Sequence, residues 1–171
     1  MEQQYPKQFR IQQSLYASSG KRFANFVVDY LLQIGLGGIF GILIGFICEL
    51  TDSYSFCNFL GNMNKIEEYL LGIVILFVYY SFFEIYFAQS PGKFLTQTIV
   101  VDEFGNKPDN NSIFLRSLVR LVPFDGLTFL GGRPGWHDRW TKTFVVNKKE
   151  LAVQKESFYA LEEIGQNSTT L

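Results

Sequence analysis

Apolar side chains are concentrated in two long blocks of this chain, residues 23–48 and roughly residues 69–87. Each block is close to the roughly 20 residues that a helix needs to cross a hydrocarbon core of about 30 Å. A helix in the core of a soluble protein seldom stays apolar on every face over such a length. The pattern therefore predicts an all-α membrane protein with two transmembrane helices.

A third apolar segment, residues 112–130, is interrupted by charges and by a proline. Arg116 and Arg120 are four residues apart, which places them on one face of a helix, and Pro123 would break that helix. The uninterrupted apolar stretches are too short to span a bilayer. We expect a re-entrant or interfacial helical segment, with three full spans as the alternative.

The basic residues set the expected orientation. The connector between the two blocks, residues 49–68, carries one basic residue, Lys65, against four acidic residues. The basic residues outside it include Lys7, Arg10, Lys21 and Arg22 before the first block, and Lys93, Lys107, Arg116 and Arg120 after the second. The positive-inside rule then predicts a cytoplasmic N-terminus and an external connector. A full third span would carry the basic C-terminal region outside, against the same rule.

Both cysteines, Cys48 and Cys57, fall on the external side in this topology. They could pair with each other in an oxidising compartment. A free cysteine also behaves as a small buried hydrophobe, and we favour that interpretation for Cys48.

Two β-branched runs lie on the cytoplasmic side. Residues 96–106 predict a short strand followed by a turn, and residues 141–146 predict a second strand. Their pairing would close the third segment into a loop anchored by a small cytoplasmic β-ribbon. We divide the chain into an N-terminal leader (residues 1–16), a membrane domain (residues 17–148) and a polar C-terminal tail (residues 149–171). The tail predicts a short amphipathic helix near residues 151–164.

The first apolar block contains a carboxylate, Asp29, about 9 Å inside its start, and Arg22 stands at its edge. A charge at such a depth is costly unless it finds a partner or water. Arg22 and Asp29 are seven residues apart, which separates them by about 10 Å along a helix axis. A direct salt bridge is therefore not expected. Arg22 should reach lipid phosphates instead, and Asp29 needs another partner.

The second block offers Glu84 near its cytoplasmic end. Two close carboxylates would repel, so either one of them holds a proton or Arg116 or Arg120 from the third segment neutralises one of them. Tyr80 and Ser81 share the Glu84 face by helical spacing and could donate hydrogen bonds. The predicted intramembrane charged cluster comprises Arg22, Asp29, Glu84, Arg116 and Arg120.

Three glycines, Gly37, Gly41 and Gly45, form a stripe in the outer half of the first block. Small residues at this spacing let helix backbones approach closely. The stripe fits contact with the second span of the same chain, and it equally fits a homo-oligomer.

The remaining polar motifs give weaker indications. Asp125, His137 and Asp138 are candidate loop or proton-relay residues, although a loop cap for the following strand is the simpler interpretation of His137-Asp138. His137 is the only histidine, and no cysteine lies on the cytoplasmic side, so we expect no metal site and no cofactor. Ser90-Pro91-Gly92-Lys93 lacks the spacing of a P-loop. It indicates a helix stop with a lysine at the headgroups.

Two functional classes find no support in the sequence. No serine or cysteine nucleophile is arranged with a base, so we expect no enzymatic activity. The formal net charge is -1 and no basic aromatic groove is visible, which argues against nucleic acid as a partner.

Three motifs follow one another along the chain: Gly20-Lys21-Arg22 with Asp29, then Gln89-Ser90-Pro91-Gly92-Lys93 with a Val-Val-Asp strand, then His137-Asp138 ahead of Thr143-Phe144-Val145-Val146. In this order and spacing they resemble the RDD family of small prokaryotic membrane proteins. The resemblance covers residues 17–148, and it implies that the arginine and two aspartates of the family name are Arg22, Asp29 and Asp138. It implies three hydrophobic segments and a bacterial inner-membrane location, and it suggests transport. This chain departs from the pattern in its charged, proline-broken third segment.

We therefore expect transport of ions or small solutes, and by an oligomer, because two spans are too few to enclose a pathway. In this hypothesis Asp29 is a proton or cation ligand and Glu84 a coupled carboxylate, while the arginines of the cluster hold anionic lipid headgroups. The expected partners are the lipid bilayer and either a second copy or another membrane protein. The alternative is a non-catalytic scaffold or a subunit of a larger membrane complex, in which the same charges only fix the fold.

Overall fold

Two long helices dominate the computed structural model, which describes residues 8–122, 124–125, 128 and 134–168. Helix α1 (Ser19–Leu50) has 32 residues and helix α3 (Lys65–Phe87) has 23, so they are about 48 Å and 35 Å long. Both are long and apolar enough to cross a membrane. The two predicted apolar helices are confirmed, and α1 extends beyond the predicted block at both ends.

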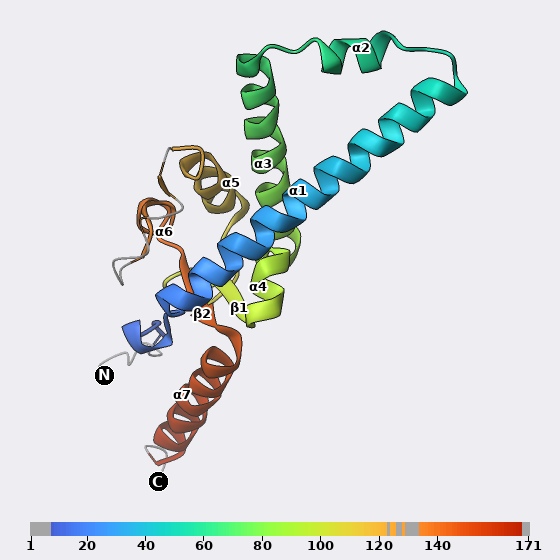
Figure 1. Ribbon diagram of the computed structural model, residues 1–171. Coiled ribbons are helices and arrows are strands. Elements are labelled where there is room, and N and C mark those ends of the chain that lie inside the picture. The colour runs from blue at the N-terminus through green and yellow to red at the C-terminus, as the bar shows by residue number, and fades with distance from the viewer. Residues whose placement is uncertain (1–7, 123, 126–127, 129–133, 169–171) are drawn as a thin grey trace.

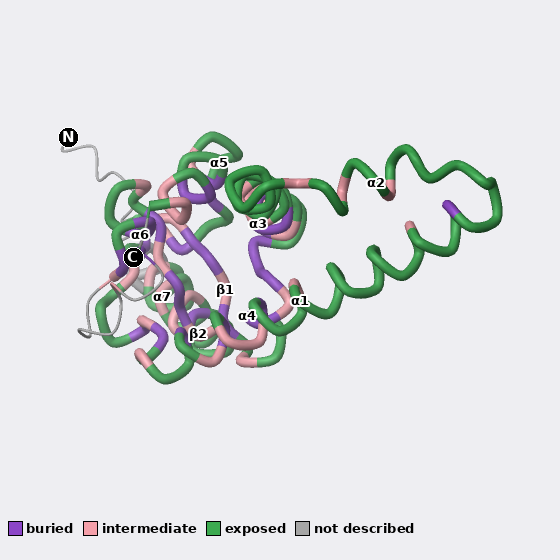
Figure 2. The backbone as a smooth tube through the Cα atoms, turned by 45° about the horizontal axis from the view of Figure 1, so that its top comes forward, coloured by how far each residue is buried: buried purple, intermediate pink, exposed green. Residues whose placement is uncertain are grey.

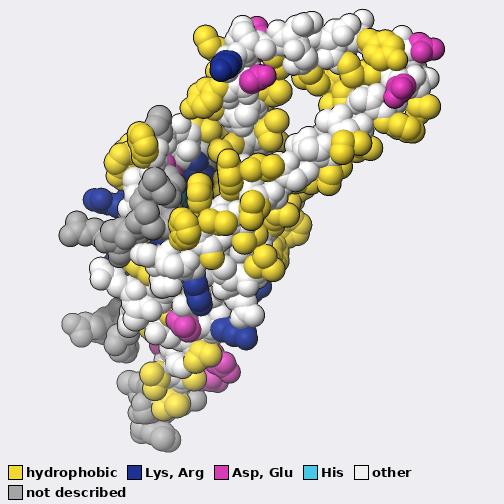
Figure 3. Space-filling view, in the orientation of Figure 1, with side chains coloured by type: hydrophobic (Ala, Val, Ile, Leu, Met, Phe, Trp, Pro, Cys, Tyr) yellow, Lys and Arg dark blue, Asp and Glu magenta, His cyan; other side chains and the backbone are white. Residues whose placement is uncertain are grey.

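The two long helices converge at one end and diverge at the other (Figure 1). The N-terminal half of α1 approaches the C-terminal half of α3, and the short helix α2 (Ser55–Gly61) lies between their separated ends. The opening between the diverging halves persists when side chains are drawn (Figure 3). The polar site described below lies where the helices converge.

Large apolar side chains cover the diverging halves of α1 and α3 (Figure 3). Ile42 of α1 is 74 % exposed, and Val74 and Ile75 of α3 are also exposed. In Figure 2 most residues of the same halves are coloured as exposed. An apolar surface of this extent suits contact with lipid tails rather than with water.

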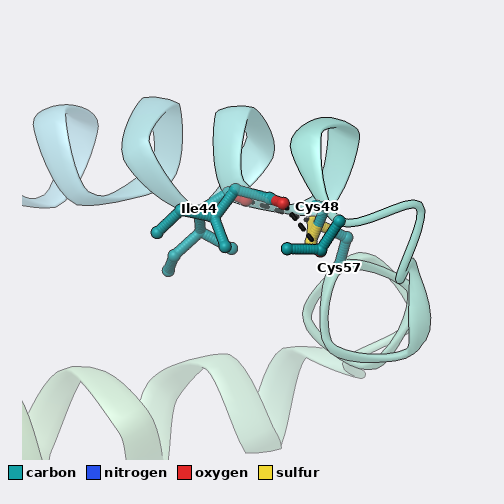
Figure 4. Close-up of a disulfide and its surroundings, with 5 residues drawn as sticks. Ile44, Cys48 and Cys57 are labelled. Carbon is teal, nitrogen blue, oxygen red and sulfur yellow. Dashed lines mark hydrogen bonds between the residues drawn. A yellow bond between two sulfur atoms is a disulfide. The ribbon is translucent and has the colours of Figure 1, made fainter.

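A disulfide joins Cys48, near the end of α1, to Cys57 of α2 (Figure 4). The interpretation of Cys48 as a free, buried thiol is therefore wrong. Cys48 is buried all the same, because the bond holds α2 against the last turn of α1. The Cys57 sulfur lies 3.8 Å from the Ile44 carbonyl oxygen; since a disulfide sulfur carries no proton, this contact is not a hydrogen bond.

A sharp turn after α3 brings the chain back against α1. Ala88, in the left-handed conformation with φ 54°, ends α3, and Pro91 opens helix α4 (Pro91–Thr96). A Cβ atom at Gly92 would lie 2.5 Å from the Asn25 carbonyl oxygen. The close crossing of α4 and α1 therefore requires glycine at position 92.

The predicted β-ribbon is confirmed. Strands β1 (Thr98–Val101) and β2 (Phe144–Asn147) pair antiparallel, with Thr98 opposite Asn147 and Val101 opposite Phe144. The predicted turn follows β1, where the Asp102 carboxylate accepts hydrogen bonds from two backbone N–H groups. The ribbon brings the two ends of the third segment together.

Helix α5 (Asn110–Val119) is the described helical part of the third segment. Its ten residues measure about 15 Å, too short to cross a bilayer. It buries Ile113, Arg116 and Ser117, whereas Phe114 and Leu115 are exposed. The helix thus turns Arg116 and Ile113 inward, and Phe114 and Leu115 outward. The bend predicted at Pro123 lies outside the described residues.

Below the converging helices, a small apolar core joins the two ends of the chain. Its buried members are Phe9, Leu15, Val101, Val146 and Leu151. They come from the segment around the 3-10 helix η1 (Gln13–Leu15), from both strands and from helix α7 (Lys148–Ser168). The described parts of the leader and the tail therefore pack on the ribbon, and α7 is longer than the amphipathic helix that the sequence predicts.

Candidate functional site

Buried polar side chains gather where α1, α3, α4, α5 and helix α6 (Trp136–Trp140) approach the ribbon. Figure 2 shows the buried backbone concentrated in this region. The first helix contributes Arg22, Asn25 and Asp29, whose spacing of three and four residues places them on one face. Helix α1 thus buries a polar face here, whereas a surface helix of a soluble protein buries its apolar face.

Asp29 is 1 % exposed and accepts three hydrogen bonds from uncharged donors. The donors are the Tyr79 hydroxyl at 3.0 Å, the Ser90 hydroxyl at 2.6 Å and the Gly92 backbone N–H at 2.8 Å. The prediction that Asp29 needs a partner other than Arg22 is confirmed. That partner is neither Glu84 nor an arginine but a set of neutral groups from α3 and the start of α4.

Glu84 is fully buried and lies among three cations. Lys93 Nζ and Arg120 Nη2 each lie 2.9 Å from its Oε1, and Arg116 Nε lies 3.1 Å from its Oε2. The alternative in which arginines of the third segment neutralise a carboxylate is confirmed. The three cations balance the negative charge of the buried Glu84 carboxylate.

Asp138 joins the third segment to the first helix. Arg22 Nη1 lies 2.5 Å from Asp138 Oδ2, and Arg116 Nη1 pairs with the other carboxylate oxygen. Arg22 also donates to the Ala17 and Val145 carbonyl oxygens. It is therefore buried among protein groups, and the expectation that it reaches lipid phosphates is wrong.

Arg116 is the central residue of the cluster because it contacts both Glu84 and Asp138. Its Nη1 also donates to the Thr143 hydroxyl, 2.5 Å away, at the start of the second strand. Burial acts to raise the pKa of Asp138, but the charges of Arg116 and Arg22 outweigh it and hold that pKa well below its ordinary value. Asp138 is therefore a permanent anion inside the fold.

Asp125 and His137 form a second buried pair beside Asp138. Asp125 accepts the His137 backbone N–H at 3.0 Å, and its Oδ2 lies 2.5 Å from His137 Nδ1. Burial, helped by the charges of Arg120 and Arg116, lowers the pKa of His137 to about 4. The ring is therefore neutral at pH 7 and donates from Nδ1 to Asp125, which fixes it against that carboxylate at the start of α6 rather than freeing it as a relay.

Several residues of the site were not predicted. Lys93 is 3 % exposed against Glu84, so its placement at the headgroups is wrong. Tyr79, which was not predicted, donates to Asp29. The predicted donor Tyr80 also lies beside Asp29, and its ring lies under Arg120 at 4.2 Å. Asn25 lies on the same helix face as Arg22 and Asp29, and its spacing in the sequence could have predicted this. No spacing in the sequence predicts that Lys93 and Tyr79 belong to the site.

The glycine stripe makes no contact within the described part of the chain. A Cβ atom placed at Gly37, Gly41 or Gly45 would meet nothing within 4 Å. The interpretation of the stripe as a contact with the second span of the same chain is therefore wrong. Among the described residues there is also no group of three or more His, Cys, Asp or Glu side chains that could hold a metal ion.

The geometry unites the residues of the three sequence motifs. Arg22 pairs directly with Asp138, and the Ser90-Pro91-Gly92-Lys93 turn supplies donors to both Asp29 and Glu84. Comparison with curated proteins and with solved structures gives no match. The profile of the RDD family matches residues 16–150, which is most of the chain and includes every residue of this cluster. The chain therefore belongs to the RDD family.

Proposed function

We propose that this RDD protein is a multi-pass protein of the bacterial inner membrane that takes part in the transport of ions or small solutes as an oligomer. The proposal is for a non-enzymatic role, with the N-terminus in the cytoplasm and the third segment re-entrant or interfacial. The observation that carries it is a buried carboxylate, Asp29, where both long helices converge and next to a small cavity.

Two features support the proposed topology. The disulfide between Cys48 and Cys57 suits an oxidising compartment outside the cytoplasm. The basic residues before α1 and after α3 suit the cytoplasmic side. A reporter fused after Lys149 should read as cytoplasmic, and an external reading would contradict the re-entrant arrangement.

Asp29 differs from the other paired buried acids, Glu84 and Asp138, in the kind of partner that holds it. Arg22, Arg116 and other cations hold Asp138 and Glu84 in ion pairs, whereas the described partners of Asp29 are neutral donors. A carboxylate held by hydroxyl and amide groups can exchange partners without breaking an ion pair. The cationic surroundings disfavour a metal cation at the same place, so a proton is the better candidate.

Proton flux in proteoliposomes tests the role of Asp29. A trapped pH dye would report flux under imposed Na⁺, K⁺ and proton gradients for wild type and Asp29→Asn at equal folded protein content. Asp52→Asn, the same change in the connector where the side chain is exposed, is the matched control. We expect flux in wild type and Asp52→Asn and loss in Asp29→Asn. Equal flux in all three would contradict the proposal.

The glycine stripe supports the oligomer. Gly37, Gly41 and Gly45 leave a narrow, uncovered strip on α1 to which a second helix could pack closely. Gly41→Leu should lower the mass of the detergent-solubilised particle, measured by light scattering. Gly72→Leu on α3, at a glycine that is equally uncovered, should not. If the wild type is itself monomeric, the interpretation of the stripe as an oligomer contact is wrong.

A second candidate function is a non-catalytic membrane scaffold or subunit. It is favoured by the pairing of Glu84 and Asp138 with four cations, Arg22, Lys93, Arg116 and Arg120, which ties α1, α3, α4, α5 and α6 together. Under this function wild type is silent under every gradient, and Asp29→Asn lowers membrane abundance or partner capture. Flux that depends on Asp29 would exclude it.

A further inference from the structure

A small cavity lies inside the charged cluster, and most of its ionisable lining is positive. Its space for water-sized occupants is about 30 Å³. The cationic residues that line it are Arg22, Lys93, Arg116 and Arg120, and the lining carboxylate is Asp29. His137 also lines it, and burial keeps that ring uncharged by lowering its pKa to about 4. The lining itself therefore carries four positive charges against one negative charge, while Glu84 and Asp138, which pair with these cations, do not line the cavity.

Three guanidinium nitrogens of the lining lack a hydrogen-bond partner among the residues that the structure describes: Nε and Nη2 of Arg116 and Nε of Arg120. Arg116 Nε still faces Glu84 Oε2 across an ion pair of 3.1 Å. The two donors left without an acceptor are Arg116 Nη2 and Arg120 Nε. Arg116 is fully buried, so its Nη2 cannot turn to bulk solvent. An unsatisfied buried donor on a charged group is costly to the fold. Both donors need an acceptor, and Glu84 and Asp138 already face the other nitrogens of the same arginines.

The charge and the size of the cavity select the class of acceptor. A metal cation would meet four positive side chains, whereas an anion would be attracted by them and could accept from both free donors. The space open to water-sized occupants is small, about 30 Å³. A single halide ion is the most compact anion that can accept from both donors there, so we take the halides as the class of anion.

A neighbouring cavity shares part of its wall with this one. It measures about 80 Å³ and shares Phe26, Tyr80 and Arg120 with the charged cavity. Tyr30, Gln33 and Leu76 add walls from α1 and α3, so the second cavity lies between the two long helices. Arg120 thus stands between the charged cavity and a space lined by aromatic side chains and by one carboxylate, Asp125.

We propose that the cavity between Arg116 and Arg120 is a binding site for one small inorganic anion of the halide class. The anion accepts from Arg116 Nη2 and Arg120 Nε, the donors that Glu84 and Asp138 leave without an acceptor. The site does not depend on the transport role, because binding and flux are separate measurements and either can fail alone.

Equilibrium dialysis of the full chain in detergent against radiolabelled chloride, with gluconate as the balancing anion, tests the site. We expect saturation at one chloride per chain, competition by bromide, and no competition by sulfate or phosphate at equal ionic strength. Arg120→Gln should weaken binding at least tenfold, while Arg139→Gln, which removes an exposed arginine of α6, should bind as wild type does. No saturable uptake, equal competition by sulfate, or equal affinity in both variants would overturn the proposal.

A measurement on wild type covers the case in which Arg120→Gln does not fold. Anomalous diffraction from crystals grown in bromide should place a bromide within hydrogen-bond reach of Arg116 Nη2 and Arg120 Nε. Bromide bound at other places, with none between these two arginines, would refute the site. Folding of the variants is checked independently through Trp136 and Trp140 fluorescence.

Discussion

Replacing Arg22 with glutamine should destabilise the whole fold, because it removes one partner of a buried ion pair. Arg22 Nη1 lies 2.5 Å from Asp138 Oδ2, and the two side chains are 7 % and 0 % exposed. Breaking a buried pair from one side costs about 3–5 kcal/mol. Asp138 keeps Arg116 and the Gly135 N–H as partners, so we place the loss at the lower end, about 3 kcal/mol.

Thermal unfolding in detergent micelles measures this loss through Trp136 and Trp140, which flank Asp138 on α6. At about 2–4 °C per kcal/mol for a chain of this size, Arg22→Gln should lower Tm by about 6–12 °C. The control is Arg139→Gln, which removes the exposed arginine that follows Asp138 in the chain. Its free energy of unfolding should stay within about 0.5 kcal/mol of wild type.

A double-mutant cycle separates the pair from other effects of either change. Arg22→Gln combined with Asp138→Asn should cost less than the sum of the single changes, by about 0.5–3 kcal/mol. Strict additivity, or a Tm for Arg22→Gln equal to that of Arg139→Gln, would refute the claim that this ion pair holds α1 to α6.

Three further predictions concern pH, packing and the disulfide. Burial lowers the pKa of His137 from 6.5 to about 4, so between these pH values the unfolded chain binds a proton that the folded chain does not. The free energy of unfolding should therefore fall by about 3 kcal/mol as the pH drops through this window. Denaturant unfolding of His137→Gln should show a free energy of unfolding that depends less on pH. Gly92→Ala should cost about 1–3 kcal/mol by forcing a Cβ atom against the Asn25 carbonyl oxygen, whereas Gly72→Ala should not lower Tm. Cys48→Ser should lower the unfolding free energy by about 2–3 kcal/mol through loss of a loop-closing bond, and a reductant should then destabilise wild type but leave the variant unchanged.

The elements of the fold were predictable because their signals are local. Apolar runs of sufficient length specify α1 and α3, and β-branched runs beside turn residues specify β1 and β2. The shared face of Arg116 and Arg120 follows from helical periodicity alone, and both do contact Glu84. A helix boundary was less predictable: α1 begins at Ser19, where the Ser18 side chain caps it ahead of the apolar block.

The partners within the site were less predictable because they depend on distance in space. Lys93 follows a helix stop, and only the sharp turn at Ala88 folds it back on Glu84. The pairing of Arg22 with Asp138 joins residues that are 116 positions apart. No periodicity relates positions so far apart, so the sequence could nominate charged residues but could not pair them.

By itself the sequence determined that this chain has two long apolar helices, a small ribbon and several charged side chains that a membrane environment would penalise. These properties follow from composition and spacing along the chain. Only the tertiary structure decided that Glu84 and Asp138 are held by cations while Asp29 has neutral donors, and that Cys48 pairs with Cys57. The physical reason is that the energy of a buried charge is set by the groups within a few ångströms of it, and those groups come from distant parts of the chain.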